Sequence, residues 1–333
     1  MSFKPIGPVK TKVTGKIEDL PALLLGGAVF NQQFNENPES LPAEEILRIG
    51  FNHGIRAIDT SPYYGPSEII LGNALKTLKE DFPRDTYYIV TKCGRVKLDD
   101  FNYSPAAIRA SILRSLERLN TNYLDLVYLH DIEFVDEDGI YGALKELRKL
   151  KNEGIIHNFG ISGYPVDFLY HIATKVTTIP EIGQLDAVLS YSNFNLQNET
   201  LRDYIDKFYK EAKLKKLLNG SILSMSLLRS GTTHAFHPAS LELKSASKDV
   251  AKLTAGKGVE LADLATRYAI GEFLPHGSTV LGVSNIAELE NAIGQYWNAV
   301  EKKVDDERLL NDVKLAFGSH LNETWASGIA HDI

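Results

Sequence analysis

The sequence predicts a single (β/α)8 barrel over residues 1–333, with helical insertions and a C-terminal tail over the barrel mouth. Three observations lead to this α/β fold class. Short apolar segments alternate with amphipathic ones, eight segments of the apolar kind can be counted, and no Pro-, Gly- or Ser-rich linker divides the chain. A repeated strand–helix order implies a parallel sheet with right-handed crossovers. Eight units of roughly 30 residues suit a closed barrel better than an open sheet.

The expected strands are short apolar runs bounded by glycine, polar or charged residues. Such runs are typical of strands that are buried on both faces of a parallel sheet. They cover residues 22–27, 55–60, 87–94, 123–130, 156–163, 185–192, 215–223 and 278–284.

The expected helices fill the segments between the strands, at residues 41–54, 67–80, 104–120, 142–154 and 261–270. We expect Ser104 to cap the third helix, with Pro105 in its first turn, and Gly154 to end the fourth. The connection after residues 190–196 is also expected to be helical. This connection and the tail at residues 309–333 lie outside the repeat, and both are expected to cover the barrel mouth.

A doubly wound nucleotide-binding fold is the main alternative to the barrel. It would need G-x-G-x-x-G at the first strand–helix turn. Residues 25–33 read LGGAVFNQQ, which does not supply that spacing, and the sequence has no Walker A motif. The barrel is therefore the expected fold.

The composition excludes several classes of partner. Hydrophobic residues make up 44% of the chain, charged residues 24%, and the formal net charge is −7. An acidic chain without a basic stripe is not expected to bind nucleic acid. No apolar run approaches the roughly 20 residues of a membrane span, and the first residues do not form a secretory signal. We therefore expect a cytoplasmic protein without membrane contacts, whose oligomeric state the sequence leaves open.

Cysteine and histidine usage predicts neither a disulfide nor a metal site. Cys93 is the only cysteine, so no intrachain disulfide can form, and a buried thiol of this kind is expected to be inert. His234 and His237 form an H-x-x-H pair, but no carboxylate or cysteine stands at ligand spacing. No bound metal is expected.

Four residues that can move or orient a proton stand at or just after the carboxyl ends of successive expected strands. They are Asp59, Tyr64, Lys92 and His130. In a barrel of this kind, the chemistry sits at the carboxyl ends of the strands. Taken singly, Tyr64 could be a surface residue and His130 a core histidine. Together, the four residues predict a proton-transfer site.

A tyrosine general acid/base is the chemistry that this set of residue types favours. A phenol titrates near ~10. An ammonium ~4 Å away, at an effective dielectric of ~20, would favour the phenolate by about 4 kcal/mol, or roughly three pKa units. The sequence therefore predicts a lowered pKa for Tyr64. Asp59 is expected to hold Lys92 charged, and His130 to donate to a substrate oxygen.

Five segments resemble the aldo-keto reductase family, and the resemblance covers nearly the whole chain. They are GIRAIDTSPYYGPSE, TKCGR, LDLVYLHD, NFGISGY and SILSMSLL. The resemblance implies an (α/β)8 barrel and a nicotinamide cofactor bound in extended form. It also implies that Tyr64 is the catalytic acid/base, with Asp59, Lys92 and His130 as its partners.

Within the family, the motifs are most similar to those of members that oxidise aldoses. This likeness implies NAD-dependent oxidation of a D-arabinose-like aldose, or of L-galactose, at C1. The product would be the aldonolactone, which would feed an ascorbate-type or erythroascorbate-type pathway. Two alternatives stay open: an NADPH-dependent carbonyl or aldehyde reductase on the same fold, and a dinucleotide-sensing regulatory subunit.

The resemblance also implies where the cofactor binds. Backbone amides of residues 221–224 are expected to meet the pyrophosphate, and Tyr191 to contact the nicotinamide. The full expected set is Gly27, Ala28, Ser162, Tyr191, Ser221, Ile222, Leu223, Ser224, Gly282 and Glu288.

The chain departs from the family pattern around the nicotinamide and the adenosine. Gly163 stands where the family commonly has asparagine, Val188 where it has glutamine, and Gly220 where many members have an aromatic residue. Gly282 and Glu288 occupy the places of the Lys and Arg of NADP-preferring members. A carboxylate repels a 2′-phosphate and can accept from a free 2′-hydroxyl group, so NAD is the expected cofactor.

Overall fold

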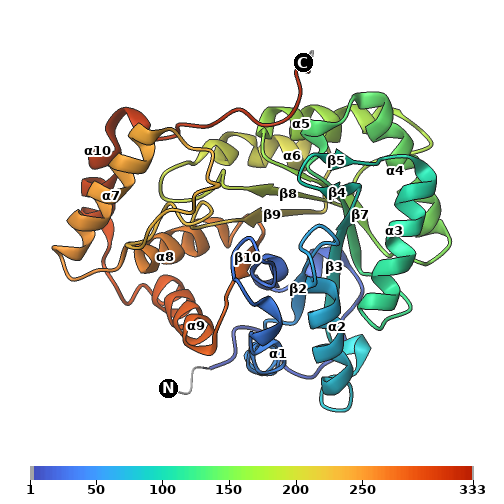
Figure 1. Cartoon of the computed structure of the whole chain (residues 1–333), viewed down its shortest axis with the longest axis horizontal. Coiled ribbons are helices and arrows are strands. Elements are labelled where there is room, and N and C mark those ends of the chain that lie inside the picture. The colour runs from blue at the N-terminus through green and yellow to red at the C-terminus, as the bar shows by residue number, and fades with distance from the viewer. Residues whose placement is uncertain (1–3, 332–333) are drawn as a thin grey trace.

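The computed structural model describes residues 4–331 and contains a closed barrel of eight parallel strands (Figure 1). Each expected apolar run contains one barrel strand, which confirms the predicted fold class. Around the barrel the strand order is β1-β10-β9-β8-β7-β6-β3-β2. The barrel strands are β1 (Leu23–Gly26), β2 (Ala57–Asp59), β3 (Tyr88–Cys93), β6 (Leu126–His130), β7 (Phe159–Gly163), β8 (Ala187–Tyr191), β9 (Lys216–Gly220) and β10 (Ser278–Gly282).

Helices form the layer around the barrel, as Figure 1 shows for α1 to α5. Their apolar faces pack on the outward side chains of the strands in one large core. The helices are α1 (Ala43–Asn52), α2 (Ser67–Leu78), α3 (Pro105–Arg118), α4 (Glu137–Asn152), α5 (Val166–Lys175), α6 (Ile205–Lys210), α7 (Leu241–Ala255), α8 (Leu261–Phe273), α9 (Ile286–Val300) and α10 (Glu307–Phe317).

Two of the predicted helix ends can be compared with the structure. Ser104 holds the N-cap position of α3 and Pro105 its first turn, but within the described chain the Ser104 side chain makes no capping hydrogen bond. It donates instead to Asn102 Oδ1 at 2.8 Å. Gly154 follows α4 with a φ of 78°, the left-handed conformation that commonly ends a helix.

Strand alternation decides which side chains face the barrel interior. On β3, Tyr88 and Val90 belong to the inner apolar cluster, so Lys92, two residues further, also points inward. Asp59 and His130 follow Ala57 and Tyr128 in the same way. The polar members of this inner set stand at the carboxyl ends of the strands, above an apolar filling.

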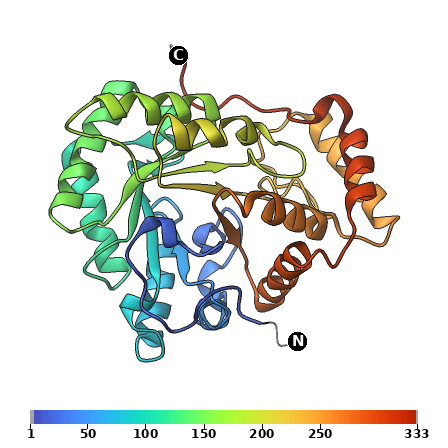
Figure 2. The same cartoon turned by 180° about the vertical axis from the view of Figure 1, so that it is seen from behind.

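The N-terminal segment closes the opposite end of the barrel. Ile17 and Leu20 are buried and pack in the inner cluster with Leu24 and Tyr88. In the view from behind, this segment is the blue chain that crosses the barrel (Figure 2). The cavity at the mouth is therefore separated from the amino-terminal end of the barrel by packed side chains.

Two insertions were not predicted. A hairpin of β4 (Arg95–Lys97) and β5 (Asp100–Phe101) follows β3, and α7 lies between β9 and α8. One prediction was wrong: the helical connection that follows β8 does not cover the barrel mouth. Its helix α6 contacts α5 and β9 in the outer layer, because Ile205 and Phe208 bury an apolar face in the main core.

The C-terminal tail has two parts. Helix α10 packs beside α7, in a second apolar cluster that includes Val313 and Phe317. Beyond it, the chain runs across to the α5 side of the molecule, as the red segment of Figure 1 shows, and Trp325–Gly328 line the cavity at the mouth. Residues 325–328 therefore lie at the barrel mouth, as predicted for the tail. Residues 332 and 333 of the predicted tail lie outside the described residues.

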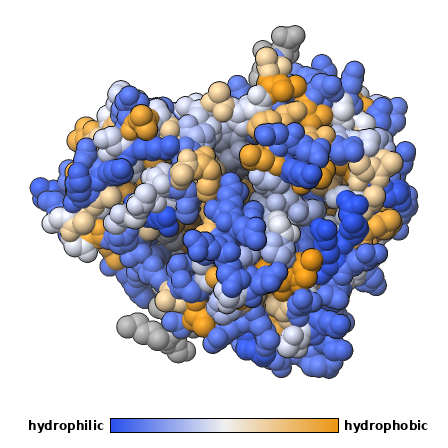
Figure 3. Space-filling view, in the orientation of Figure 1, coloured by the Kyte–Doolittle hydropathy of each residue, from blue (hydrophilic) through white to orange (hydrophobic). Residues whose placement is uncertain are grey.

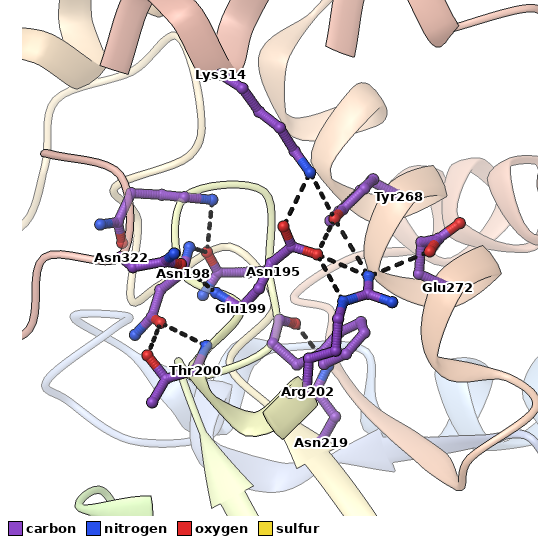
Figure 4. A network of polar contacts seen from close by, with 12 residues as sticks. Asn195, Asn198, Glu199, Thr200, Arg202, Asn219, Tyr268, Glu272, Lys314 and Asn322 are labelled. Atoms are coloured by element: carbon purple, nitrogen blue, oxygen red, sulfur yellow. Dashed lines mark hydrogen bonds and ion pairs between the residues drawn. The ribbon is translucent and has the colours of Figure 1, made fainter. Parts of the chain in front are cut away.

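A polar network fastens the tail to the barrel (Figure 4). Glu199 accepts from Lys314 of α10 at 2.8 Å, from Arg202 at 2.6 Å and from the hydroxyl group of Tyr268 in α8. The Glu199 amide donates to Asn322 Oδ1 at 2.8 Å. One half-buried carboxylate thus joins three segments that are far apart in the sequence.

Hydrophilic side chains cover most of the face in Figure 3, with apolar residues in scattered small groups. Of the helices in residues 4–331, not one combines the length and apolarity that crossing a bilayer requires.

Candidate active site

A cavity of about 1450 Å³ opens at the carboxyl ends of the barrel strands. It extends from His130 and Trp325 to Glu288 and Asn291 on α9. A site for one drug-sized ligand measures roughly 300–1,000 Å³, so this cavity has room for an extended dinucleotide and a second small molecule. The last inward residues of the strands line it: Gly26, Asp59, Lys92, His130, Ser162, Tyr191, Gly220 and Gly282.

Lys92 and Asp59 form a buried ion pair on neighbouring strands. Lys92 Nζ lies 2.5 Å from Asp59 Oδ1 and donates to the Thr60 carbonyl oxygen at 3.0 Å. The two residues are only 2% and 3% exposed, so water screens the pair little. Burial lowers the pKa of Lys92, but the electrostatic and hydrogen-bonding interactions with Asp59 and Tyr64 together outweigh burial and raise it. Lys92 is therefore a fixed ammonium.

Tyr64 stands in the turn that follows β2, above the ion pair. Its amide donates to the Ser61 carbonyl oxygen at 3.0 Å, and Gly65 follows in the left-handed region at φ 56°. Lys92 Nζ is 5.0 Å from the centre of the Tyr64 ring, and the His130 ring centre is 5.6 Å away, edge to face. The turn thus brings the phenol to the three strand-end residues, as predicted.

The predicted direction of the Tyr64 pKa shift was wrong. Burial in the cavity raises the pKa of Tyr64 above its ordinary value of 10, and the charge of Lys92 opposes this effect without reversing it. The attraction between ammonium and phenolate, on which the sequence prediction relied, is only one part of the balance. The other part is the cost of removing the phenolate from water. In the described structure Tyr64 is a neutral phenol, ready to donate a proton.

His130 is held as a neutral imidazole. Burial, then the charges of Lys92 and Arg95, lower its pKa well below 6.5. Ser61 Oγ lies 3.0 Å from His130 Nδ1 and already accepts from the Tyr63 amide at 3.1 Å. Its own hydroxyl hydrogen can therefore go to Nδ1, which leaves the ring proton on Nε2. Nε2 can then donate to a ligand oxygen.

Arg95 and Asp131 form a second ion pair at the cavity, which the sequence did not predict. Arg95 Nη1 binds Asp131 Oδ2, and the side chains are 12% and 4% exposed. Both residues line the cavity. The motifs TKCGR and LHD contain them, but residue type alone did not show that the loops after β3 and β6 meet.

The tail builds one wall of the cavity. Trp325 stacks on Tyr164 with ring centres 4.5 Å apart, and Tyr164 packs against Tyr191. Ser327 donates to Glu133 Oε1 at 3.0 Å, and the Ile329 amide donates to the Glu133 carbonyl oxygen at 2.9 Å. Glu133, just beyond β6, thus anchors the segment that carries Trp325.

Most of the expected cofactor residues line the cavity. They are Ala28, Ser162, Tyr191, Ser221, Ile222, Leu223, Gly282 and Glu288. Gly27 and Ser224 do not. The space beside Gly27 is filled by Ser67 and Thr60, whose hydroxyl oxygens would stand 2.6 and 2.9 Å from a Cβ. The Ser224 amide already donates to the Ser221 carbonyl oxygen at 2.7 Å, within its own turn.

The departures from the family pattern have local causes. A Cβ at Gly163 would stand 2.4 Å from Glu133 Oε2, so the buried carboxyl group excludes a side chain there. Val188 points outward into the main core, whereas its neighbour Leu189 lines the cavity. A Cβ at Gly220 would meet only ordinary contacts at 3.5 Å or more. Glycine there leaves the cavity wider beside Tyr191.

Glu288 takes part in the side-chain cap at the start of α9. Asn285 Oδ1 accepts from the Glu288 amide at 2.9 Å. The Glu288 carboxylate accepts from the Ser284 amide at 2.7 Å and from Asn285 Nδ2 at 2.9 Å. The sequence Asn-x-x-Glu has the spacing of a capping box, but the Glu288 carboxylate accepts from the residue before the N-cap instead of from the N-cap amide. The sequence prediction did not include this cap. The carboxylate is therefore fixed and exposed at the far end of the cavity.

Histidine and cysteine outside the four-residue set have structural contacts. His237 Nε2 lies 2.8 Å from the Ser224 carbonyl oxygen, and Nδ1 accepts from the Ala239 amide at 3.1 Å. His234 packs on Phe34 and Phe236 above the cavity. Burial raises the pKa of the Cys93 thiol. Among residues 4–331, no three His, Cys, Asp or Glu side chains are grouped so as to hold a metal.

Comparison with known proteins agrees with this geometry. The sequence profile of the Aldo/keto reductase family matches residues 22–308. D-arabinose 1-dehydrogenase of Saccharomyces cerevisiae is 53% identical over 315 residues, which cover 93% of this chain and 94% of that protein. L-galactose dehydrogenase of Arabidopsis thaliana is 36% identical over 290 residues, which cover 86% and 88%.

Solved structures share the fold at lower identity. The glycerol dehydrogenase of Gluconobacter oxydans matches with a TM-score of 0.64 and 20% identity, over 94% of this chain and 96% of that one. A likeness at this identity concerns the fold alone. It agrees with the closed barrel described above.

Proposed function

Because the chain belongs to the Aldo/keto reductase family, we propose that it is an oxidoreductase that oxidises an aldose at C1 to the aldonolactone. The observation that carries this proposal is the meeting of Tyr64, Lys92 and His130 in one cavity with room for a sugar and a dinucleotide. The relative with 53% identity is named for the same reaction class. D-arabinose is the proposed substrate, and L-galactose the second candidate.

In the proposed reaction, the C1 hydroxyl group loses a proton while the C1 hydrogen leaves as a hydride. Tyr64 takes the proton. Lys92 favours the phenolate form of Tyr64 in that step, and Asp59 keeps Lys92 charged. His130 donates from Nε2 to the C1 oxygen and orients the sugar. Loss of the proton and the hydride leaves C1 as the carbonyl carbon of the lactone.

The cofactor is proposed to be NAD, whose nicotinamide, when bound, supplies the acceptor for the hydride. The exposed Glu288 carboxylate supports this choice, because it would repel the 2′-phosphate of NADP and can accept from a 2′-hydroxyl group. Gly282, beside it, brings no cation. Serving a pathway of the ascorbate or erythroascorbate type is part of the same proposal.

Steady-state turnover of an aldose panel with NAD and with NADP tests the proposal. We expect NADH formation with D-arabinose or L-galactose, and release of the lactone. Faster turnover of simple aldehydes with NADPH would favour the carbonyl reductase instead. Dinucleotide binding without turnover of any aldose or aldehyde would favour the regulatory subunit.

A further inference from the structure

The buried ion pair of Arg95 and Asp131 is the feature of the cavity that the proposed proton transfer does not use. Both residues line the cavity. Asp131 Oδ2 is 3.6 Å from His130 Nε2, the atom that would hold the reacting oxygen. The pair therefore stands where atoms next to the reacting carbon of a substrate would lie.

The pair is held rigidly. Arg95 Nη2 donates to the Leu98 carbonyl oxygen at 2.9 Å and Nε to that of Lys97 at 3.4 Å, both in the β4–β5 hairpin. The guanidinium group also lies 4.0 Å from the centre of the Tyr63 ring. A guanidinium group has five N–H groups, and these contacts together with the one to Asp131 engage three of them.

Two features of the Arg95–Asp131 pair cost folding free energy. Burying an ion pair costs solvation free energy that the attraction does not always return. Asp131 also adopts the left-handed region, with φ 57° and ψ 63°, which aspartate visits more readily than most non-glycine residues but which still costs backbone free energy. Strain of this kind gathers at functional sites, and an observed outlier motivates a functional hypothesis.

We propose that Arg95 and Asp131 are the substrate-recognition pair of this cavity, which binds hydroxyl groups on the carbons next to C1 of an uncharged aldose. This inference rests on the proposed function. Vicinal hydroxyl groups both donate and accept, so Arg95 donates to one and Asp131 accepts from another. The charges of the pair cancel, which favours a neutral polyol over an anionic sugar. Trp325 and Tyr63 offer aromatic faces for the C–H side of the ring.

A site built to bind a hydroxyl group discriminates against a substrate that lacks it, because its own polar groups are then left unpaired. A simple aldehyde brings the reacting carbonyl group and no further hydroxyl groups. The pair should therefore matter more for sugars than for such an aldehyde. This contrast separates recognition from a structural role of the ion pair, which would affect all substrates alike.

The test compares variants across matched substrates. Arg95→Leu, Arg95→Lys and Asp131→Asn are assayed for oxidation of D-arabinose and of its 2-deoxy and 3-deoxy forms, and for reduction of 4-nitrobenzaldehyde with NADH. We expect kcat/KM for D-arabinose to fall roughly tenfold to a hundredfold, mainly through KM. Activity on the aldehyde should fall clearly less than activity on D-arabinose. The loss caused by each variant should also be much smaller on one of the deoxy sugars than on D-arabinose.

Asn tolerates the left-handed conformation, so Asp131→Asn keeps the test valid if Arg95→Leu does not fold. Cofactor affinity and circular dichroism report on folding. Equal losses on all four substrates, or an unchanged KM for D-arabinose, would overturn the role of the pair. Absence of aldose turnover by the wild-type protein would overturn the proposed function instead.

Discussion

Lys92 is the residue on which the electrostatics of the cavity depend. It is almost fully buried, it is paired with Asp59, and its charge lowers the pKa of His130 and opposes the raised pKa of Tyr64. The net result is a neutral acid beside a neutral hydrogen-bond donor. Such an arrangement is suited to protonating a carbonyl oxygen, and the reverse reaction needs the phenolate form of Tyr64.

We predict that sugar oxidation becomes faster as the pH rises. The pKa of Tyr64 is raised, so the phenolate is a minor form near neutral pH, and its fraction grows about tenfold per pH unit below that pKa. The kcat/KM for aldose should therefore increase from pH 7 to pH 9 at saturating NAD. Tyr64→Phe should lose roughly 10²- to 10⁴-fold in kcat, with cofactor affinity unchanged.

Tyr63→Phe is the matched control, because Tyr63 lines the same cavity and lies beside Tyr64. The Tyr63→Phe variant should retain the wild-type kcat and the increase of kcat/KM with pH. Activity of Tyr64→Phe within tenfold of the wild type would exclude Tyr64 as the acid/base.

A second prediction at this scale concerns the cofactor. Glu288→Gln removes the negative charge and keeps an oxygen that can accept from the Ser284 amide. We expect the ratio of kcat/KM with NAD to that with NADP to fall roughly fivefold to tenfold, mostly through better use of NADP. Glu290→Gln, an exposed change on the same helix, should leave the ratio unchanged. No change for Glu288→Gln would remove the main support for NAD preference.

The tail segment after α10 is the element that completes the cavity. It carries Trp325 and Ser327, and its docking depends on a close approach at Gly328. That residue has a φ of +87°, and a Cβ there would stand 2.2 Å from the Glu133 carbonyl oxygen. Only glycine can make this approach without displacing the segment.

We therefore predict that Gly328→Ala raises KM for the aldose severalfold and leaves NAD affinity unchanged, because the cofactor contacts proposed at α9 lie at the other end of the cavity. Gly258→Ala is the control. Gly258 has a similar φ of +75°, and nothing lies within 4 Å of an added Cβ. Steady-state kinetics and fluorescence titration with NADH measure both effects. Equal KM values for the two variants would contradict a role of tail docking.

For the molecule as a whole, Glu133 links folding stability to pH. Burial, and then the charge of Asp131, raise the pKa of Glu133 from 4.5 to about 8. In the unfolded chain this carboxyl group ionises near its ordinary pKa, whereas the folded protein keeps it protonated up to about pH 8. Between pH 4.5 and about pH 8, folding therefore takes up a proton. The free energy of unfolding should fall as the pH rises through this range.

Glu133→Gln mimics the protonated carboxyl group and should weaken this dependence. We expect its free energy of unfolding, measured by urea denaturation, to change less between pH 5 and pH 8 than that of the wild type. Relative to the wild type, the variant should gain stability toward pH 8. Parallel pH profiles for the two proteins would show that Glu133 is not the responsible group. Glu290→Gln, at an exposed site, serves as the control.

The sequence by itself determined the barrel and the four residues at its centre. Strand periodicity and strand order are local properties of the chain, and the carboxyl ends of parallel strands must meet at one edge. Asp59, Lys92 and His130 were therefore predictable as neighbours. The side-chain cap formed by Asn285 and Glu288 is also local and could have been recognised from its spacing. The cytoplasmic location stays a prediction.

Only the tertiary structure decided which loops contact one another and how much hydration an ionisable side chain such as Tyr64 loses. Arg95 meets Asp131, and Glu133 meets Ser327, across 36 and 194 residues of sequence, because separate loops fold over the same mouth. The direction of the Tyr64 pKa shift depends on how much water surrounds the phenol. Burial is a property of the packed molecule, so it cannot be predicted from the spacing of residues along the chain.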